Sequence, residues 1–394
     1  MAKRNKEKEE SILKQEQIDI LANDVLEIIN RKFKEKDLPD AAGYMSNANL
    51  VTNWRPTGCD ILDLAISNRP YGGLGFGTIV EMTGLEGSGK SLLAAHILTE
   101  CQKKGGLAVL FDTEKALGML DFYCSVGLDP NKVIYSDRLR ALEEVYQAME
   151  LIIEKALLID KNRPVTIVVD SVMGASTLAE LESDFEKDGY ATSKAIVNSK
   201  AMRKIPSLIA GKNILIILIN QLRDAVGAIG FGADKYQTSG GKAIGFTAST
   251  RLRLKRIGQL KGKINGIDSI IGESIEVAII KNRLGPPKRK VKFDIRYDSG
   301  IDNYGSWLTM LKELGGIGQS GSSYSYKYVD GDTGEEVTKK FQSKDFKKLI
   351  EETPGLKDVI YEQICEAYIM KYDLGEEELG IDDIELVTEE DELD

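Results

Sequence analysis

Between about residues 57 and 300, the apolar residues of the chain follow two alternating patterns. Short continuous apolar runs, typical of strands buried on both faces, occur at residues 79–82, 107–114, 165–170 and 214–221. Over residues 141–159, apolar residues instead recur every three or four positions, as on one face of a helix. The alternation predicts an α/β fold, in which a mostly parallel, twisted sheet between helices binds ligands at the carboxyl ends of its strands.

The segment before this core has the pattern of an amphipathic helix. Over residues 11–33, apolar side chains fall on one helical face, at Ile18, Leu21, Val25, Ile28 and Ile29. Two interpretations remain open: the helix packs on its own domain, or it is an arm that packs on a neighbouring subunit.

Beyond residue 250, apolar and polar residues alternate, which is typical of half-buried strands. Strands are predicted at residues 251–256, 274–283 and 288–297, the last with Val291, Phe293, Ile295 and Tyr297 facing inward. A helix at 307–314, a hairpin of 324–329 with 335–341, and helices at 344–353 and 356–372 follow. We expect four parts: an N-terminal helix and oligomerisation arm (1–56), the core (57–300), a small α+β domain (301–373) and an acidic tail (374–394).

A glycine-rich segment joins the first apolar run to a helix. Residues 84–91 match G-x-x-x-x-G-K-[ST], the phosphate-binding loop, whose backbone N–H groups point at one spot beside a helix N-terminus. Lys90 would reach the β- and γ-phosphates, and the Ser91 hydroxyl would bind Mg²⁺. The nucleotide-binding candidates are Gly84, Leu85, Glu86, Gly87, Ser88, Gly89, Lys90 and Ser91.

Three polar residues follow other strand-like runs. Asp170 closes a V-x-I-V-V-D run and has the form of an acid that holds Mg²⁺. Glu114 is placed to act as the general base that orients the attacking water, and Gln221 could sense the γ-phosphate as an uncharged donor. Because parallel strands present their carboxyl ends at one edge of a sheet, we expect these residues to meet beside the phosphate loop.

The segment 223–242 predicts a long loop. It contains many glycines, few apolar residues, and the cations Arg223, Lys235 and Lys242 with the aromatic residues Phe231 and Tyr236. This composition suits contacts that follow the backbone of single-stranded nucleic acid. A loop without a ligand is the alternative. Further along, Lys281 and Arg283 are two residues apart and would share one face of a strand.

Composition narrows the chemistry. The four cysteines lack C-x-x-C spacing, which indicates reduced thiols, and the single histidine, His96, excludes His-based triads and is interpreted as a packing residue. No apolar run approaches the roughly 20 residues of a membrane span, so a cytoplasmic protein is expected. The net charge of −10 is uneven, because the tail 374–394 contains many acids and no basic residue while 251–292 is strongly basic. Such a tail could compete with a polyanion for a basic surface.

The chain resembles the RecA family of DNA strand-exchange recombinases, which includes bacterial members and the UvsX-type recombinases of T-even phages. The motifs occur in the family's order over roughly residues 55–330. They are Thr57–Ala65, Gly84–Ser91, Phe111–Leu117, Val168–Val172, Ala201–Lys204, Ile219–Arg223, Ser239–Ala243, Val277–Arg283 and Gly300–Gly305.

The resemblance implies a role for each matching residue. Lys90 and Ser91 correspond to the phosphate and Mg²⁺ residues, Glu114 to the catalytic base, Asp170 to the Mg²⁺ acid, and Gln221 to the switch between the γ-phosphate and a DNA-binding loop. Lys281 and Arg283 fall where family members reach the ATP of the adjacent subunit. The implied DNA-binding residues are Ser199, Arg203, Arg223, Val226, Gly240, Gly241 and Lys242.

This sequence also departs from the family's pattern. The stretch after Glu114 is one residue longer than in the bacterial members, so Phe122 or Tyr123 would stack on adenine, with Phe122 favoured. The long loop also differs inside, which leaves the residue that inserts into DNA undetermined. The C-terminal part from about residue 331 matches only weakly.

The expected function is that of a DNA-dependent ATPase and recombinase. It would use ATP and Mg²⁺, form a helical filament on single-stranded DNA, and pair that strand with homologous duplex DNA. Its partners would be both DNA forms, further copies of the chain, and single-strand-binding and mediator proteins, in the bacterial cytoplasm or a phage-infected host. Another motor on the same core, such as a ring helicase, and a nucleotide-regulated filament without exchange activity are the alternatives.

Overall fold

A computed structural model describes most of the chain between residues 22 and 371. The described residues are 22–32, 34, 42, 51–115, 120–183, 192–224, 236–238, 240–329 and 334–371. The acidic tail, the start of the N-terminal helix and most of the long loop, including Val226, lie outside them. The contacts divide the chain into two units, residues 1–50 and 51–394.

The first unit contains part of the expected amphipathic helix. Residues 22–32 are helical, and Val25 and Ile28 on this helix expose 45% and 56% of their surface. Asn30 ties the helix to the segment that follows, since its side chain exchanges hydrogen bonds of 2.9 and 2.8 Å with the backbone of Ala42.

A large sheet organises the second unit, and its strand order is β12-β11-β10-β9-β3-β7-β6-β4-β5. Its central strands pair in parallel, as the continuous apolar runs predict for strands covered on both faces. They are β3 (Thr78–Gly84), β4 (Leu107–Asp112), β5 (Val133–Ser136), β6 (Val165–Asp170) and β7 (Ile214–Asp224). The predicted fold class is therefore confirmed.

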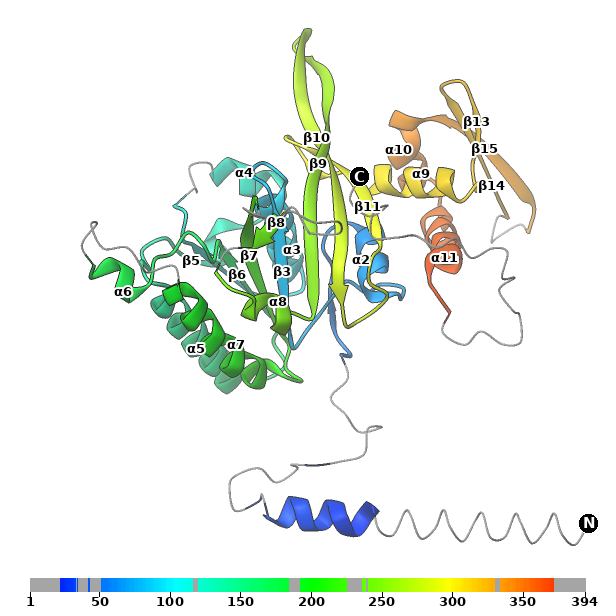
Figure 1. Ribbon diagram of the computed structural model, residues 1–394. Coiled ribbons are helices and arrows are strands. Elements are labelled where there is room, and N and C mark those ends of the chain that lie inside the picture. The colour runs from blue at the N-terminus through cyan, green and yellow to red at the C-terminus, as the bar shows by residue number, and fades with distance from the viewer. Residues whose placement is uncertain are drawn as a thin grey trace, which may run out of the picture. The chain divides into compact units, whose positions relative to one another are not determined.

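The other end of the sheet is antiparallel. Its strands are β9 (Thr250–Ile264), β10 (Ile267–Asn282), β11 (Lys290–Arg296) and β12 (Gly300–Ile301). A tight turn at Asn265 and Gly266, both with positive φ, joins β9 to β10. The pairing of β9 with β3 covers Thr250–Leu254, and the two long strands then rise clear of the sheet (Figure 1).

The predicted strands 251–256 and 274–283 are thus too short, because β9 and β10 continue as one hairpin. The Asn-Gly pair is a strong signal for such a turn. The apolar alternation that defines the rest of each strand is interrupted by Gly258, Gly262 and Gly272, and the outer part of the hairpin has little buried surface to reveal it.

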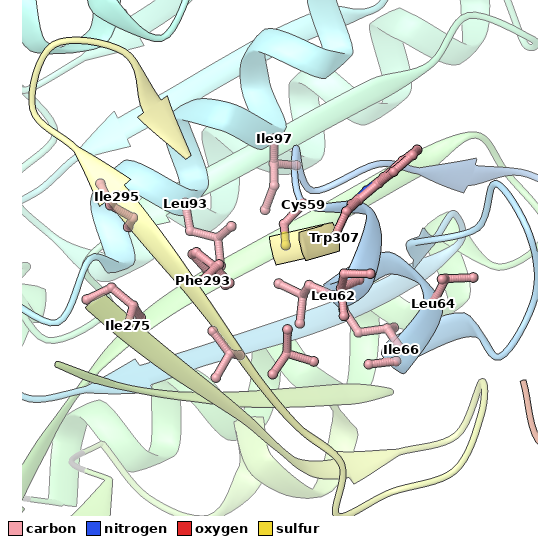
Figure 2. Packing of buried hydrophobic residues seen from close by; sticks show 14 of the residues in the cluster. Cys59, Leu62, Leu64, Ile66, Leu93, Ile97, Ile275, Phe293, Ile295 and Trp307 are labelled. Atoms are coloured by element: carbon pink, nitrogen blue, oxygen red, sulfur yellow. The ribbon is translucent and has the colours of Figure 1, made fainter. Parts of the chain in front are cut away.

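Alternate residues of the parallel strands face two different hydrophobic cores. One core joins inward residues such as Met82 and Ile217 to α2 (Asp60–Ser67), α3 (Lys90–Lys103) and α9 (Asn303–Glu313). Figure 2 shows this core, where Leu62, Leu93, Phe293 and Trp307 meet. The opposite core joins residues such as Ile216 to α5 (Leu142–Ile159), α7 (Ser193–Ile209) and α8 (Ala243–Thr247). The helices therefore cover both faces.

A smaller sheet and two helices follow α9. The sheet has the order β13 (Gly318–Ser320), β14 (Ser323–Val329) and β15 (Glu336–Gln342), and its neighbours are α10 (Phe346–Glu352) and α11 (Leu356–Tyr368). The expected hairpin and the last two helices are present. The helix predicted at 307–314 begins four residues earlier, because Asp302 caps it by accepting a hydrogen bond from the N–H of Gly305.

One inward-facing prediction is wrong. Val291, Phe293 and Ile295 are buried, but Tyr297 exposes 51% of its surface. The strand β11 ends at Arg296, so the alternation stops before Tyr297. Its hydroxyl instead donates a hydrogen bond of 3.2 Å to Glu273 at the surface.

The remaining short elements connect these layers. They are β1 (Trp54–Arg55), β2 (Leu74–Gly75), α4 (Leu120–Ser125), the 3₁₀ turns Pro130–Lys132 and Ser343–Asp345, α6 (Leu178–Leu181) and β8 (Tyr236–Thr238). β8 pairs with the end of β7, so the two ends of the predicted long loop form a short antiparallel ladder. All four cysteines are free thiols, and none of the described helices is long and apolar enough to cross a bilayer.

Candidate functional site

The phosphate-loop motif lies between β3 and α3. β3 ends at Gly84, and α3 begins at Lys90 after Gly89, which caps the helix with a φ of 85° that a side chain would disfavour. Leu85, Glu86 and Gly87 are exposed, while Ser88 is buried. No acidic residue lies in the first turn of α3, so the positive end of the helix dipole is free to attract an anion.

The ammonium group of Lys90 is folded over this loop. It donates hydrogen bonds to the carbonyl oxygens of Gly84 and Leu85 at 3.1 and 2.7 Å. Burial lowers the pKa of Lys90, although the nearby carboxylate of Asp170 opposes that shift. The cation therefore lies at the mouth of the loop, where a phosphate would offer it a stronger partner than a carbonyl.

Ser91 and Asp170 are in direct contact. The Ser91 hydroxyl donates a hydrogen bond of 2.6 Å to Oδ2 of Asp170. Burial raises the pKa of Asp170 to about 6, against the lowering effect of this hydrogen bond. A cation beside the pair would favour the ionised carboxylate. Among the described residues, no group of three or more His, Cys, Asp and Glu is arranged to hold a metal ion. Mg²⁺ needs none, because it takes one or two protein oxygens with water and phosphate.

Glu114 lies at the same edge of the sheet. The ends of β4 and β6 pair there, with Asp112 opposite Asp170. Oε1 of Glu114 accepts a hydrogen bond of 2.7 Å from Nε2 of Gln221 and a second, short one from the hydroxyl of Ser171. The structure thus brings Glu114, the expected base, together with Gln221, the expected sensor, and with Ser171, which directly follows Asp170.

Sequence reasoning missed Ser171. It is completely buried, follows Asp170 directly, and accepts a hydrogen bond of 3.2 Å from the N–H of Gly174 while donating to Glu114. A hydroxyl placed directly after the acid at a strand end was the available signal. Ser171 fixes the direction of the Glu114 carboxylate.

Both candidates for the adenine contact, Phe122 and Tyr123, lie on α4. The side chain of Phe122 lies outside the described part of the structure. Tyr123 packs against the hydrophobic core with its ring partly buried, and burial raises the pKa of its hydroxyl.

Lys281 and Arg283 lie toward the amino end of β3, whereas the phosphate loop follows its carboxyl end. Gly84 pairs with Leu254 of β9, whereas Lys281 pairs with Arg251, three residues earlier on the same strand. Three residues of strand span roughly 10 Å. Both cations instead contact α8, as Lys281 donates to the carbonyl of Phe246 at 2.7 Å and Arg283 at 3.1 Å.

The DNA-binding candidates fall into two groups. Ser199 and Arg203 lie on α7 and are joined by a hydrogen bond of 3.0 Å. Gly240, Gly241 and Lys242 lead into α8. The backbone of Arg223 belongs to β7 and pairs with Gln237 of β8, although its side chain lies outside the described part.

Comparison with known proteins agrees with this geometry. A model of the RecA N-terminal domain family matches residues 21–302. The chain is 33% identical to Protein RecA of Syntrophobacter fumaroxidans over 319 residues, which cover 81% of this chain and 85% of that protein. It is 35% identical over 286 residues to Protein RecA of Bartonella henselae, covering 73% and 77% of the two chains. For Protein RecA of Bifidobacterium breve the identity is 36% over 286 residues, covering 73% and 68%. This chain therefore belongs to the RecA family.

Proposed function

We propose that the protein is an ATP-dependent DNA recombinase that forms a filament on single-stranded DNA and exchanges strands with a homologous duplex. The observation that supports this most strongly is the position of Gln221. Its side chain contacts Glu114 beside the phosphate loop, and the next residues of β7 pair with β8 at the base of the long loop. One strand therefore connects the candidate hydrolysis site to the candidate DNA-binding loop.

The contacts support the following roles at the nucleotide. Lys90 and the N–H groups of 84–91 would bind the phosphates, and Ser91 with Asp170 would hold the metal. When bound, Mg²⁺ would neutralise charge on the β- and γ-phosphates. Glu114 orients the attacking water and accepts its proton, while Ser171 keeps the carboxylate in place.

Lys281 and Arg283 act on the ATP of the neighbouring subunit. Their distance from the phosphate loop of their own chain supports this role. This surface contains a hollow of about 350 Å³ beside Arg283. Thr78, Ile209 and Phe246 also line it. Phe246 exposes 69% of its surface there, which suits a contact between subunits.

The filament would be built by a head-to-tail contact between copies. Leu151, Leu158 and Ile159 of α5 are exposed by 59%, 76% and 82%. Several exposed apolar residues on one helix make α5 a candidate contact surface. We infer that the N-terminal helix of a second copy, with its exposed Val25 and Ile28, covers this surface.

DNA would be held mainly through its backbone. Ser199, Arg203 and Lys242 provide polar and cationic groups, and Gly240 and Gly241 allow a close backbone approach. Sequence would be read by base pairing between strands rather than by the protein. From its bacterial relatives we also infer a cytoplasmic location, in a bacterium or a phage-infected bacterial host.

Strand exchange between homologous oligonucleotides, measured together with ATP hydrolysis in the presence and absence of single-stranded DNA, tests the proposal. We expect DNA-stimulated hydrolysis and ATP-dependent exchange. Unwinding of a duplex without a homologous strand would indicate a helicase instead. Filaments on DNA without exchange would indicate the structural alternative.

A further inference from the structure

A buried carboxylate lies in the middle of β3. Glu81 is 0% exposed. Its Oε2 accepts a hydrogen bond of 2.5 Å from Nε of Arg251 on β9, and its Oε1 accepts one of 3.1 Å from Nδ2 of Asn220 on β7. Burying an ion pair costs free energy of desolvation. Its place in the centre of the sheet therefore calls for a role beyond stability.

Arg251 also packs against helix α8, at Gly245. A Cβ atom on Gly245 would lie only 3.0 Å from Cζ of the Arg251 guanidinium. The guanidinium therefore fills the space that a side chain at position 245 would occupy. The helix can approach β9 this closely because residue 245 is glycine and because Glu81 fixes the guanidinium in one orientation.

The same turn of α8 holds Lys281. Its ammonium donates hydrogen bonds of 3.0 and 2.7 Å to the carbonyl oxygens of Gly245 and Phe246. Arg283 donates to Phe246 as well, at 3.1 Å. Lys281 is also the direct neighbour of Arg251 across the β9 and β10 pair. The position of both cations thus depends on where α8 packs.

Charge supports the same connection. Three cations, Arg251, Lys281 and Arg283, gather beside Glu81 and α8. Burial is the main cause that lowers the pKa of Lys281, followed by repulsion from Arg283 and Arg251, and Glu81 opposes the shift. The Glu81 carboxylate therefore compensates part of the repulsion within the cluster.

We propose that Glu81 and Arg251 are positioning residues for the interfacial cations: by fixing α8, they hold Lys281 and Arg283 where the neighbouring subunit's ATP can meet them. This inference rests on the proposed function. It predicts that a change at Glu81 impairs hydrolysis of the ATP bound by the neighbouring subunit, which Lys281 and Arg283 contact, and not of the ATP bound by its own subunit. The alternative is that Glu81 affects the ATP site of its own subunit. It could do so through its hydrogen bond with Asn220, because Asn220 directly precedes Gln221.

Mixing two impaired variants separates these routes. Glu81→Gln is combined with Lys90→Ala, which has an impaired phosphate loop but intact cations. In a random equimolar filament, about a quarter of the interfaces join an intact phosphate loop to intact, correctly held cations. We expect Glu81→Gln alone to reduce DNA-stimulated hydrolysis by ~10- to 100-fold, and addition of Lys90→Ala to raise the rate toward about a quarter of the wild-type rate. Wild-type hydrolysis by Glu81→Gln, or no rise on mixing, would overturn the inference.

Gly245→Ala provides a second variant that keeps both charged partners, Glu81 and Arg251. Its added methyl group displaces the Arg251 guanidinium, so hydrolysis should fall and should be restored by Lys90→Ala in the same way. Combined with Lys281→Ala, it should cause a smaller further loss than it causes in the wild type, because the part of its effect that acts through Lys281 is already gone and only the part through Arg283 remains. Full activity of Gly245→Ala, or losses that add, would refute the inference even if Glu81→Gln failed to fold.

The matched mixture of Arg283→Ala with Lys90→Ala tests the proposed function separately. If this mixture gains no activity, the interfacial site itself is wrong. If it gains activity while the Glu81→Gln and Gly245→Ala mixtures do not, only the positioning role of Glu81 and Arg251 fails.

Discussion

Nε2 of Gln221 donates a hydrogen bond of 2.7 Å to Oε1 of Glu114. The two residues lie 107 positions apart in the chain. They meet because Gln221 of β7 is level with the end of β3 and Glu114 closely follows the end of β4, at one edge of the sheet. The hydroxyl of Ser171 donates to the same oxygen. Since one oxygen accepts both protein donors, the other oxygen of Glu114 can face the water that attacks the γ-phosphate.

Glu114→Gln should abolish most hydrolysis while leaving nucleotide binding intact. An amide cannot accept a proton from water, and loss of a general base commonly costs ~10²- to 10⁴-fold in rate. Lys90, Ser91 and Asp170 remain to hold ATP and metal, so the ATP-bound filament should accumulate. Hydrolysis is measured with single-stranded DNA, and ATP binding is measured by equilibrium titration. Hydrolysis equal to that of the wild type would contradict the role of Glu114 as base.

Gln221→Ala should uncouple DNA binding from the nucleotide. The change removes the donor that links β7 to Glu114, but it leaves Glu114 tied to Ser171. We expect ATP still to bind, and the affinity for single-stranded DNA to become the same with a non-hydrolysable ATP analogue as with ADP. Fluorescence anisotropy of a labelled oligonucleotide gives both affinities. A difference as large as that of the wild type would show that Gln221 is not the link.

The meeting of Asp170, Glu114 and Gln221 could be predicted because each closes an apolar run, and parallel strands gather their carboxyl ends. The contacts of Glu81 could not be predicted, since a single acid inside an apolar run does not indicate which distant residues it pairs with. Its partners, Asn220 and Arg251, lie 139 and 170 residues away. Tyr297 was predicted wrongly for a related reason. The alternation of apolar and polar residues continues in the sequence up to Tyr297, but β11 ends at Arg296. Only its pairing with β10 shows where the strand ends.

His96 should make the stability of the fold depend on pH. Its Nε2 accepts a hydrogen bond of 3.0 Å from the N–H of Ile301, which requires the neutral ring. Burial, and secondarily Lys103, lowers its pKa to about 4. As the pH falls below about 6.5, the unfolded chain therefore takes up the proton first, and stability is lost down to about pH 4.

Urea unfolding at pH 7 and pH 5 measures this effect. His96→Gln keeps an acceptor for Ile301 but cannot titrate, so the wild type should lose about 1–2 kcal/mol more than this variant between the two pH values. Because the chain contains a single histidine, the imidazole signal in an NMR titration needs no assignment. Equal losses in both proteins, or an imidazole that titrates near 6.5, would contradict the prediction.

Asn198 connects the base of the long loop to the helical layer. It is fully buried on α7. Its Oδ1 accepts a hydrogen bond of 2.8 Å from the hydroxyl of Tyr146 on α5, and its Nδ2 donates one of 2.9 Å to the carbonyl of Gly240. The side chain therefore holds the backbone at Gly240, a DNA-binding candidate, against α7.

Asn198→Leu should weaken binding to single-stranded DNA without affecting the nucleotide. Without the hydrogen bond to Gly240, the base of the loop is no longer held against α7. If this hydrogen bond contributes about 1 kcal/mol to DNA binding, roughly fivefold more DNA is needed for half-maximal stimulation of hydrolysis. ATP affinity without DNA should stay the same, because Asn198 lies outside the phosphate-loop contacts. Tyr146→Phe is the matched control, since it removes the other hydrogen bond and keeps the one to Gly240. If Tyr146→Phe raises the DNA requirement as much as Asn198→Leu does, the effect comes from packing between α5 and α7 rather than from the hold on Gly240.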